Sequence, residues 1–109
     1  IAASSGDGVM GDGGWKTLVR GQAMTPAQAA GLSADSTKAG VSLIWTIYDN
    51  PIDFPGHFIA RPYDMNMGCA YQLHMAARTL DGLRAMVPPG LVRLPRDPRD
   101  DRCIVEVWL

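Results

Sequence analysis

The sequence lacks long hydrophobic runs, and this absence excludes a membrane-spanning helix. Its uninterrupted apolar runs, such as Leu43–Trp45, fall far short of the about 20 residues that a bilayer requires. The N-terminal stretch has neither a cationic start nor an apolar core, so no signal peptide is expected. The sequence therefore predicts a cytoplasmic protein without a membrane partner.

The sequence also lacks an excess of charge of either sign. Ten lysine and arginine residues stand against 11 aspartate and glutamate residues, which gives a net charge of -1. Such a balance supplies no field that would draw the chain onto nucleic-acid phosphates. The arginines between residues 93 and 102 alternate with Asp97, Asp100 and Asp101, and no aromatic residue lies among them to stack on bases. We expect a solvated loop there and no nucleic-acid partner.

Cysteine and histidine are scarce, with two of each. Cys69 and Cys103 form no C-x-x-C motif and have no histidine at zinc spacing. One disulfide between them and two reduced thiols both remain open, and two buried, reduced thiols are the favoured interpretation. The methionines between residues 65 and 75 would suit Cu(I) by ligand type, but methionine usually fills gaps in cores. We predict no metal and no cofactor.

What the sequence does contain is typical of one folded domain. Its 109 residues are 47% hydrophobic and 19% charged, which suits a single core and lies far from the composition of disordered chains. Residues 1–14 carry five glycines and bury too little to offset the entropy of ordering them. We predict a disordered lead over 1–14 and a single α+β domain over 15–109.

Four segments alternate apolar residues as β-strands do, at 43–49, 57–61, 69–75 and 103–109. A turn cluster at 50–56 joins the first two into a hairpin, and Pro62 ends the second because proline cannot donate to a ladder. A brief further strand is open at 91–94. These segments predict an antiparallel sheet of about four strands.

Two helices are expected beside this sheet. Thr25, Pro26 and Gln28 have the order of an N-cap, a first helical proline and a capping-box glutamine. They predict a short N-terminal helix that ends at Gly31. Thr79 is a suitable N-cap for the main helix, which is expected to run to residue 87 and to pack on one face of the sheet.

The hairpin string from Trp45 to Arg61, W-T-I-Y-D-N-P-x-D-F-P-G-H-F-x-x-R, together with the closing E-V-W-L, resembles small uncharacterised bacterial proteins from phage, plasmid and gene-cassette contexts. The resemblance covers about half of the chain. It implies a self-contained small bacterial protein of mobile-element type, and it carries over no catalytic residue, cofactor or substrate.

Alternation along the strands assigns side chains to two faces of the sheet. One face collects core residues such as Trp45 and Ile47. The other is a mixture of aromatic, charged and apolar side chains, too apolar for a plain solvated surface. The predicted binding face consists of Tyr48, His57, Arg61, His74, Glu106 and Trp108. Residues 15–19 are short and apolar enough to form a strand or an arm that packs Trp15 onto the domain, which we call the Trp15 arm. A homodimer or other protein interface, a cover formed by the Trp15 arm and the Thr25 helix, and a small-molecule site all remain open for this face.

An enzymatic alternative uses three residues near the hairpin loop. Asp53 could orient His57 as a general base, and Arg61 could hold an anion on the same side. The structural alternatives are a turn aspartate bonded to its own backbone and a surface His and Arg paired with carboxylates. No serine or cysteine nucleophile is placed beside His57, so no catalytic triad is predicted.

The sequence thus predicts a small protein that works by association rather than catalysis. Its expected partner is a second copy of itself in a homodimer, or another protein, through the predicted binding face. The alternative is a small enzyme or ligand-binding protein with its pocket around His57, Asp53 and Arg61.

Overall fold

From residue 21 onward the chain forms one β-sheet accompanied by two helices. The computed structural model describes residues 21–109. The strands are β1 (Gln22–Ala23), β2 (Leu43–Asp49), β3 (Phe58–Asp64), β4 (Cys69–Ala70), β5 (Leu73–Ala77), β6 (Arg93–Pro95) and β7 (Ile104–Trp108). The helices are α1 (Pro26–Lys38) and α2 (Leu80–Arg84). The predicted disordered lead at 1–14 and the expected Trp15 arm lie outside the described residues.

The sheet is larger than predicted and it is mixed. Six of its seven strands follow the order β1-β5-β3-β2-β7-β6, and the seventh, β4, pairs with β3 beside this path. All pairs are antiparallel except β1 with β5, which is parallel. The prediction of an antiparallel sheet of about four strands was therefore wrong. The strand predicted over 69–75 is divided into β4 and β5, and β6 overlaps the brief strand left open at 91–94. Only β1 was not anticipated, because two residues are too few for the alternation from which a strand is read in a sequence.

β3 continues through Pro62, where the sequence analysis ended it. On one side Pro62 lies opposite Trp45 of β2. On the other side β3 pairs with β5 only over Phe58–Ala60 and with β4 only from Tyr63 onward. The missing proline N–H falls at this gap. On this side Pro62 uses its carbonyl, which accepts the N–H of Tyr71 at 3.0 Å. A proline is thus accommodated inside an otherwise continuous strand.

α1 begins as predicted and extends further. The Thr25 hydroxyl accepts the N–H of Gln28 at 3.1 Å, and the Gln28 side chain accepts the N–H of Thr25 at 2.8 Å. Gly31 does not stop the helix, which runs for 13 residues to Lys38. The chain instead turns at Gly40, whose φ of +75° suits glycine. The short N-terminal helix of the prediction is therefore the longer helix of the molecule.

α2 is correspondingly shorter than predicted. Thr79 caps it by accepting the N–H of Gly82 at 3.0 Å, as expected, but it contains only five residues and ends at Arg84. After Arg84 the chain tightens, since the N–H groups of Met86 and Val87 donate to carbonyls three residues before them, at 2.9 and 3.4 Å. Pro88 has no N–H with which to continue the helix. The expectation of one main helix was wrong. Neither helix of the described chain is long and apolar enough to cross a membrane.

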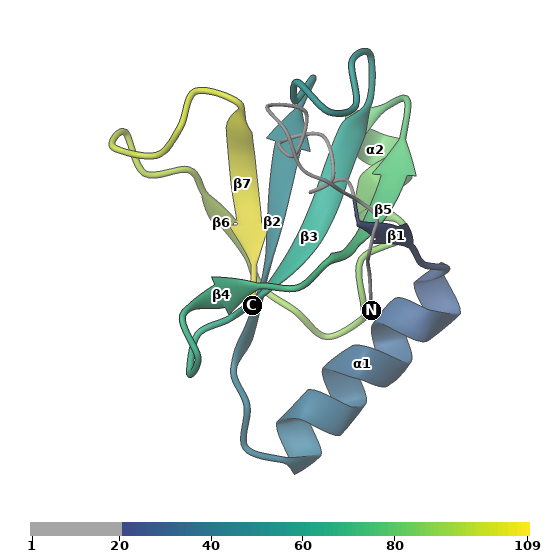
Figure 1. Ribbon diagram of the computed structural model, residues 1–109, viewed down its shortest axis with the longest axis vertical. Helices are drawn as coiled ribbons and strands as arrows, with labels where there is room; N and C mark the ends of the chain where they lie inside the picture. Colours follow the sequence, from purple (N-terminus) through teal and green to yellow (C-terminus); the bar gives the residue numbers. More distant parts are fainter. Residues whose placement is uncertain (1–20) are drawn as a thin grey trace, which may run out of the picture.

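The core lies on the face of the sheet that α2 covers, which we call the α2 face. Trp45, Ile47 and Ala60 are fully buried there, together with Leu83 of α2. Burial of each large apolar side chain contributes about 1.5–3 kcal/mol. α1 adds the buried Ala29 to this cluster and lies below the strands in the view of Figure 1 rather than across them. We call the other side of the sheet the opposite face.

Both edges of the sheet are short. β1 has two residues and β6 has three, of which the last is Pro95. Val92 exchanges hydrogen bonds with Leu109 beside β7, at 2.8 and 3.0 Å, so the alternate residues Arg93 and Pro95 direct their backbone groups away from the sheet. The outer edge of β6 therefore presents a proline where a donor would otherwise stand.

Candidate functional site

The pairing of β7 with β2 decides which face each predicted binding residue occupies. Glu106 lies opposite the core residue Ile47, and Trp108 shares the side of Glu106. A β-bulge between Ile47 and Tyr48 then shifts the register. Glu106 and Trp108 consequently lie on the α2 face, whereas Tyr48 lies on the opposite face. The expectation that all of these residues share one face is corrected by this register.

On the opposite face, five side chains of the hairpin and of β5 form what we call the Arg61 cluster. The Arg61 guanidinium forms an ion pair with Asp53 and lies 5.7 Å from the centre of the Tyr48 ring and 5.9 Å from that of Phe54. The Phe54 and His74 ring centres are 4.6 Å apart. Aromatic faces attract a guanidinium, and burial raises the pKa of the Tyr48 hydroxyl although Arg61 acts against this. The predicted residues Tyr48, Arg61 and His74 are thus brought together.

His57 has a different neighbour from the one that catalysis would require. Its Nδ1 lies 3.0 Å from the carbonyl oxygen of Pro55, within its own loop. Asp53, the expected partner of His57, instead pairs with Arg61. A carboxylate committed to an arginine does not orient the imidazole as a general base. The geometry therefore brings together Asp53 and Arg61 but not the complete set of the enzymatic alternative.

The loop between β2 and β3 is held by Asn50. This residue adopts a φ of +53°, a left-handed conformation that asparagine tolerates better than most residues. Its side-chain oxygen accepts the N–H of Gly56 at 2.8 Å, and its own N–H donates to the carbonyl of His57 at 2.9 Å. The loop is therefore closed across its base, which places Asp53 and Phe54 against Arg61.

A second part of the opposite face carries exposed aliphatic side chains. Val92, Leu94 and Leu109 are 61%, 41% and 48% exposed. Leu94 pairs with Val107, and Val107 pairs with Thr46 of β2. Paired residues on adjacent strands share a face, and Thr46 alternates with the core residues Trp45 and Ile47. These side chains therefore point to the opposite face. Ile44 reaches the same side by alternation along β2. We call this surface the aliphatic patch, and it consists of Ile44, Val92, Leu94, Val107 and Leu109.

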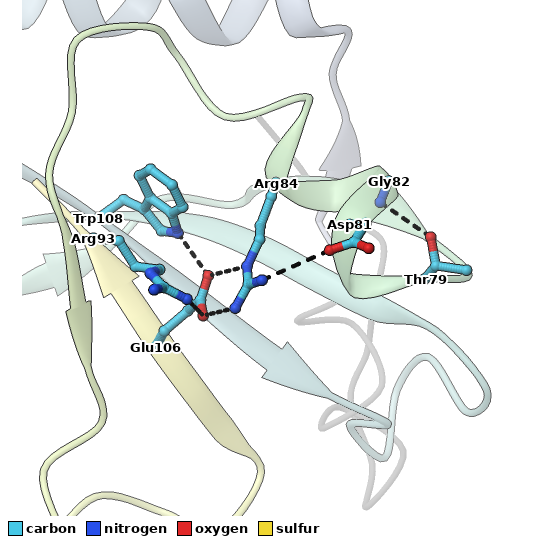
Figure 2. A network of polar contacts seen from close by, with 7 residues as sticks. All are labelled: Thr79, Asp81, Gly82, Arg84, Arg93, Glu106 and Trp108. Atoms are coloured by element: carbon cyan, nitrogen blue, oxygen red, sulfur yellow. Dashed lines mark hydrogen bonds and ion pairs between the residues drawn. The ribbon is translucent and has the colours of Figure 1, made fainter.

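On the α2 face, polar contacts converge on the buried carboxylate of Glu106 (Figure 2). Arg84 of α2 donates Nε to one carboxylate oxygen at 3.0 Å and Nη2 to the other at 2.7 Å. The indole N–H of Trp108 donates to Oε2 at 2.9 Å. Nη1 of Arg93, on β6, lies 3.7 Å from Oε1 of Glu106. A carboxylate oxygen of Asp81 lies 3.7 Å from Nη1 of Arg84. We call these five residues the Glu106 network.

The pKa values in this network follow from its contacts. The hydrogen bond from Arg84 lowers the pKa of Glu106, and the bond from Trp108 and the charges of both arginines act in the same direction. Burial opposes them but is outweighed. The same hydrogen bond raises the pKa of Arg84. Glu106 is therefore held as a carboxylate inside the protein by donors from β7 and α2.

The two cysteines do not form a disulfide, and both are free thiols. Cys69 is exposed and Cys103 is half-buried, so the expectation of two buried thiols is corrected for Cys69. Burial raises the pKa of the Cys103 thiol, which disfavours its reactive thiolate form. Within residues 21–109, His, Cys, Asp and Glu side chains form no group of three that could hold a metal ion.

Several residues of these surfaces escaped the sequence analysis. Arg84 lies in the segment predicted as the main helix, and a long arginine side chain there can reach a carboxylate on the sheet. Phe54 lay inside a loop and its ring contact with His74 depends on how that loop folds. Val92 lies just before β6 and Leu94 lies within it, in a segment for which the sequence analysis left only a brief strand open. Only the pairing of β6 with β7 places these two beside Leu109.

Comparison with known proteins adds no information about the surfaces on either face of the sheet. No protein-family model matches the chain, and no curated protein or solved structure is significantly similar to it. The resemblance of residues 45–61 to small mobile-element proteins stays a prediction. The functional argument therefore rests on the geometry of the two faces.

Proposed function

We propose that this protein functions by association and that two copies bind each other through the aliphatic patch. The observation that carries the proposal is the exposure of Val92, Leu94 and Leu109 on one side of neighbouring strands. Single exposed aliphatic residues are ordinary, but a contiguous group on one face is typical of an interaction surface. The proposed function keeps the predicted homodimer and moves its interface from the hairpin end of the sheet to the β6–β7 end.

The patch extends across several strands, as an interface would require. Leu94, Val107 and Thr46 form one row across β6, β7 and β2. The next row contains Val92 and Leu109, joined by two backbone hydrogen bonds, with Ile44 beyond them on β2. Two such faces can pack on one another as the sheets of a β-sandwich do.

A second copy is the partner that the charges favour. The aliphatic patch contains no charged side chain, and the nearby Arg61 already pairs with Asp53. Packing two copies together would therefore bury no unpaired charge. The chain has a net charge of -1, which produces little repulsion between copies. An apolar surface is self-complementary under a two-fold axis, since each copy contributes the same residues.

The edges of the sheet are less suited to association than its face. Pro95 removes a donor from the outer edge of β6, and β1 offers only two residues. Short or proline-bearing edges oppose pairing between sheets. Face-to-face packing is therefore the arrangement that we propose.

The ligand-binding alternative around His57, Asp53 and Arg61 has less support. Asp53 and Arg61 neutralise each other, and His57 contacts the carbonyl of Pro55. A site that recognises a charged ligand would direct at least one of these charged groups toward that ligand. We therefore do not propose catalysis at this place.

The proposal is tested by the mass of the protein in solution, measured by light scattering behind a sizing column over a range of concentrations. The wild type should have twice the mass of one chain. A double variant, Leu94→Asp with Leu109→Asp, should have the mass of one chain, because it would bury charges against an apolar partner surface. Both side chains are exposed in the single chain, so the variant should remain folded.

Ile52→Asp is the matched control, because Ile52 is 98% exposed at the loop between β2 and β3 and lies outside the aliphatic patch. This variant should keep the dimer mass while losing a comparable apolar side chain. Circular dichroism and urea unfolding would establish that all variants fold. A wild type with the mass of one chain at every concentration would contradict the proposal, as would a double variant that still dimerises.

A further inference from the structure

The Glu106 network contains more positive charge than its buried carboxylate needs. Arg84 binds the Glu106 carboxylate with two hydrogen bonds in a bidentate arrangement, and Trp108 adds a third hydrogen bond. The guanidinium of Arg93 lies 3.7 Å from Oε1 of Glu106, the oxygen that accepts from Nη2 of Arg84. This distance is too long for a hydrogen bond. One arginine thus neutralises the buried Glu106. The charge of the second is offset within the network only by Asp81, whose side chain is 96% exposed and lies 3.7 Å from Arg84.

The two guanidinium groups are held close together and both reach solvent. They come from different elements, Arg84 from α2 and Arg93 from β6, and meet at one carboxylate (Figure 2). Their side chains are 31% and 54% exposed, whereas that of Glu106 is only 4% exposed. Glu106 therefore lies beneath the two arginines and fixes the position of Arg84 from the protein side.

Unused donors remain on the outer side of this pair. A guanidinium has five N–H donors, and Arg84 uses Nε and Nη2 for Glu106. Its Nη1 lies 3.7 Å from Asp81, without a hydrogen bond. The guanidinium of Arg93 makes no hydrogen bond to any residue of the described part of the chain. Both arginines can therefore donate to a further acceptor without releasing Glu106.

From this geometry we propose that Arg84 and Arg93 bind an oxyanion of the phosphate class on the α2 face. A tetrahedral dianion offers acceptors to two guanidinium groups at once and compensates the charge of Arg93. Glu106 is the positioning residue, since it binds Nε and Nη2 of Arg84. Nη1 is left on the side of the exposed Asp81. The site lies on the other side of the sheet from the aliphatic patch, so it does not depend on association.

Asp81 is the competitor within this site. Its side chain is 96% exposed, and an exposed ion pair at this distance contributes little free energy. A bound dianion can displace it from Nη1 of Arg84. Removal of this carboxylate should therefore strengthen anion binding, whereas removal of Arg93 should weaken it.

The test follows the indole N–H signal of Trp108 by NMR while inorganic phosphate is added at constant ionic strength. This group donates to Glu106 and reports on its surroundings, and Trp108→Phe identifies its signal. The signal should shift in a saturable manner with phosphate and not with chloride. Arg93→Ala should weaken the phosphate affinity about tenfold, the cost of losing charge-assisted hydrogen bonds, and Asp81→Asn should strengthen it.

Arg99→Ala is the matched control, since Arg99 is 90% exposed and pairs with Asp97 in a separate loop. It should bind phosphate as the wild type does. Arg93 is half-exposed, so its variant should fold, and circular dichroism would show this. An unsaturable shift, an equal response to chloride, or an unchanged affinity of Arg93→Ala would overturn the proposal. Because the measurement needs no partner protein, its outcome is independent of the oligomeric state.

Discussion

Glu106 is a charged residue inside the protein, and its three hydrogen bonds explain why it is tolerated there. Charged groups are buried at a large cost unless donors replace water. Arg84 and Trp108 supply these donors from α2 and β7. The strand β7 thereby buries a carboxylate at a position where alternation alone would favour an apolar side chain.

Replacement of Glu106 should consequently be costly. In Glu106→Gln the amide loses the charge that Arg84 requires, and in either orientation its NH2 group faces a nitrogen that donates to the carboxylate in the wild type. We expect the free energy of unfolding to fall by about 2–3 kcal/mol, measured by urea denaturation. Asp81→Asn is the control, because its exposed pair with Arg84 should change stability by less than about 0.5 kcal/mol. Equal effects of the two substitutions would contradict this role of Glu106.

The lowered pKa of Glu106 also predicts how stability depends on pH. Because the folded-state pKa lies below that of the unfolded chain, the carboxylate contributes stability above the unfolded value of about 4.3. This contribution should disappear as the pH falls through the lower folded pKa. Unfolding free energies of wild type and Glu106→Gln, compared from pH 7 to pH 3, should therefore converge under acid conditions. A difference that stays constant with pH would contradict this linkage.

The candidate binding residues could be predicted from the sequence only in part. Tyr48 and Arg61 come together because they lie on adjacent strands of one hairpin, where register follows from local pairing. Glu106 was misplaced, because the sequence analysis put it on the face opposite Trp45 and Ile47, whereas the register pairs it with Ile47. The arginine that allows Glu106 to be buried lies on α2, and no pattern within β7 indicates it.

At the scale of elements, local chemistry located the starts of the helices and missed their ends. The capping box at Thr25 and the cap at Thr79 are confirmed by their hydrogen bonds. Gly31 failed as a stop signal because nothing in its surroundings requires a left-handed residue there. Gly40, with its φ of +75°, meets that requirement. β2 was predicted with its bounds correct, since seven residues are enough for alternation to be read.

The loop between β2 and β3 provides a prediction at this scale. Asn50→Ala removes the hydrogen bond to Gly56 and places an alanine at a φ of +53°. We expect a loss of about 1–2 kcal/mol in the free energy of unfolding, measured by thermal or urea denaturation. Asn50→Gly loses the same bond but accepts the conformation, so it should cost less than alanine. An alanine variant as stable as the glycine variant would argue against backbone strain at this position.

For the whole molecule, the distribution of side chains separates two surfaces. The α2 face holds the core and the Glu106 network, and the opposite face holds the Arg61 cluster and the aliphatic patch. This separation could not be predicted from the sequence, because it depends on β6 joining β7 and on the bulge in β7. Both features come from pairings between segments that carry weak signals of their own.

Pro95 provides a prediction at this largest scale. In Pro95→Thr the outer edge of β6 gains an N–H donor, and threonine favours extended backbone. We expect species larger than a dimer to appear in light scattering as the concentration rises. Pro98→Thr, in the loop beyond β6, is the control and should leave the size distribution unchanged. A Pro95→Thr protein with the wild-type distribution would show that the proline does not guard this edge.

The short edges of the sheet also determine how the protein would behave in concentrated solution. In a pair formed through the aliphatic patch, the described chain places the two-residue strands β1 and β4 and the proline-bearing β6 at the margins of each sheet. Strands this short, or interrupted by proline, are not suited to recruiting a third copy. Growth would therefore be self-limiting. Scattering intensity per unit of mass should rise to a plateau on concentration, and the viscosity should remain that of small particles rather than of fibres.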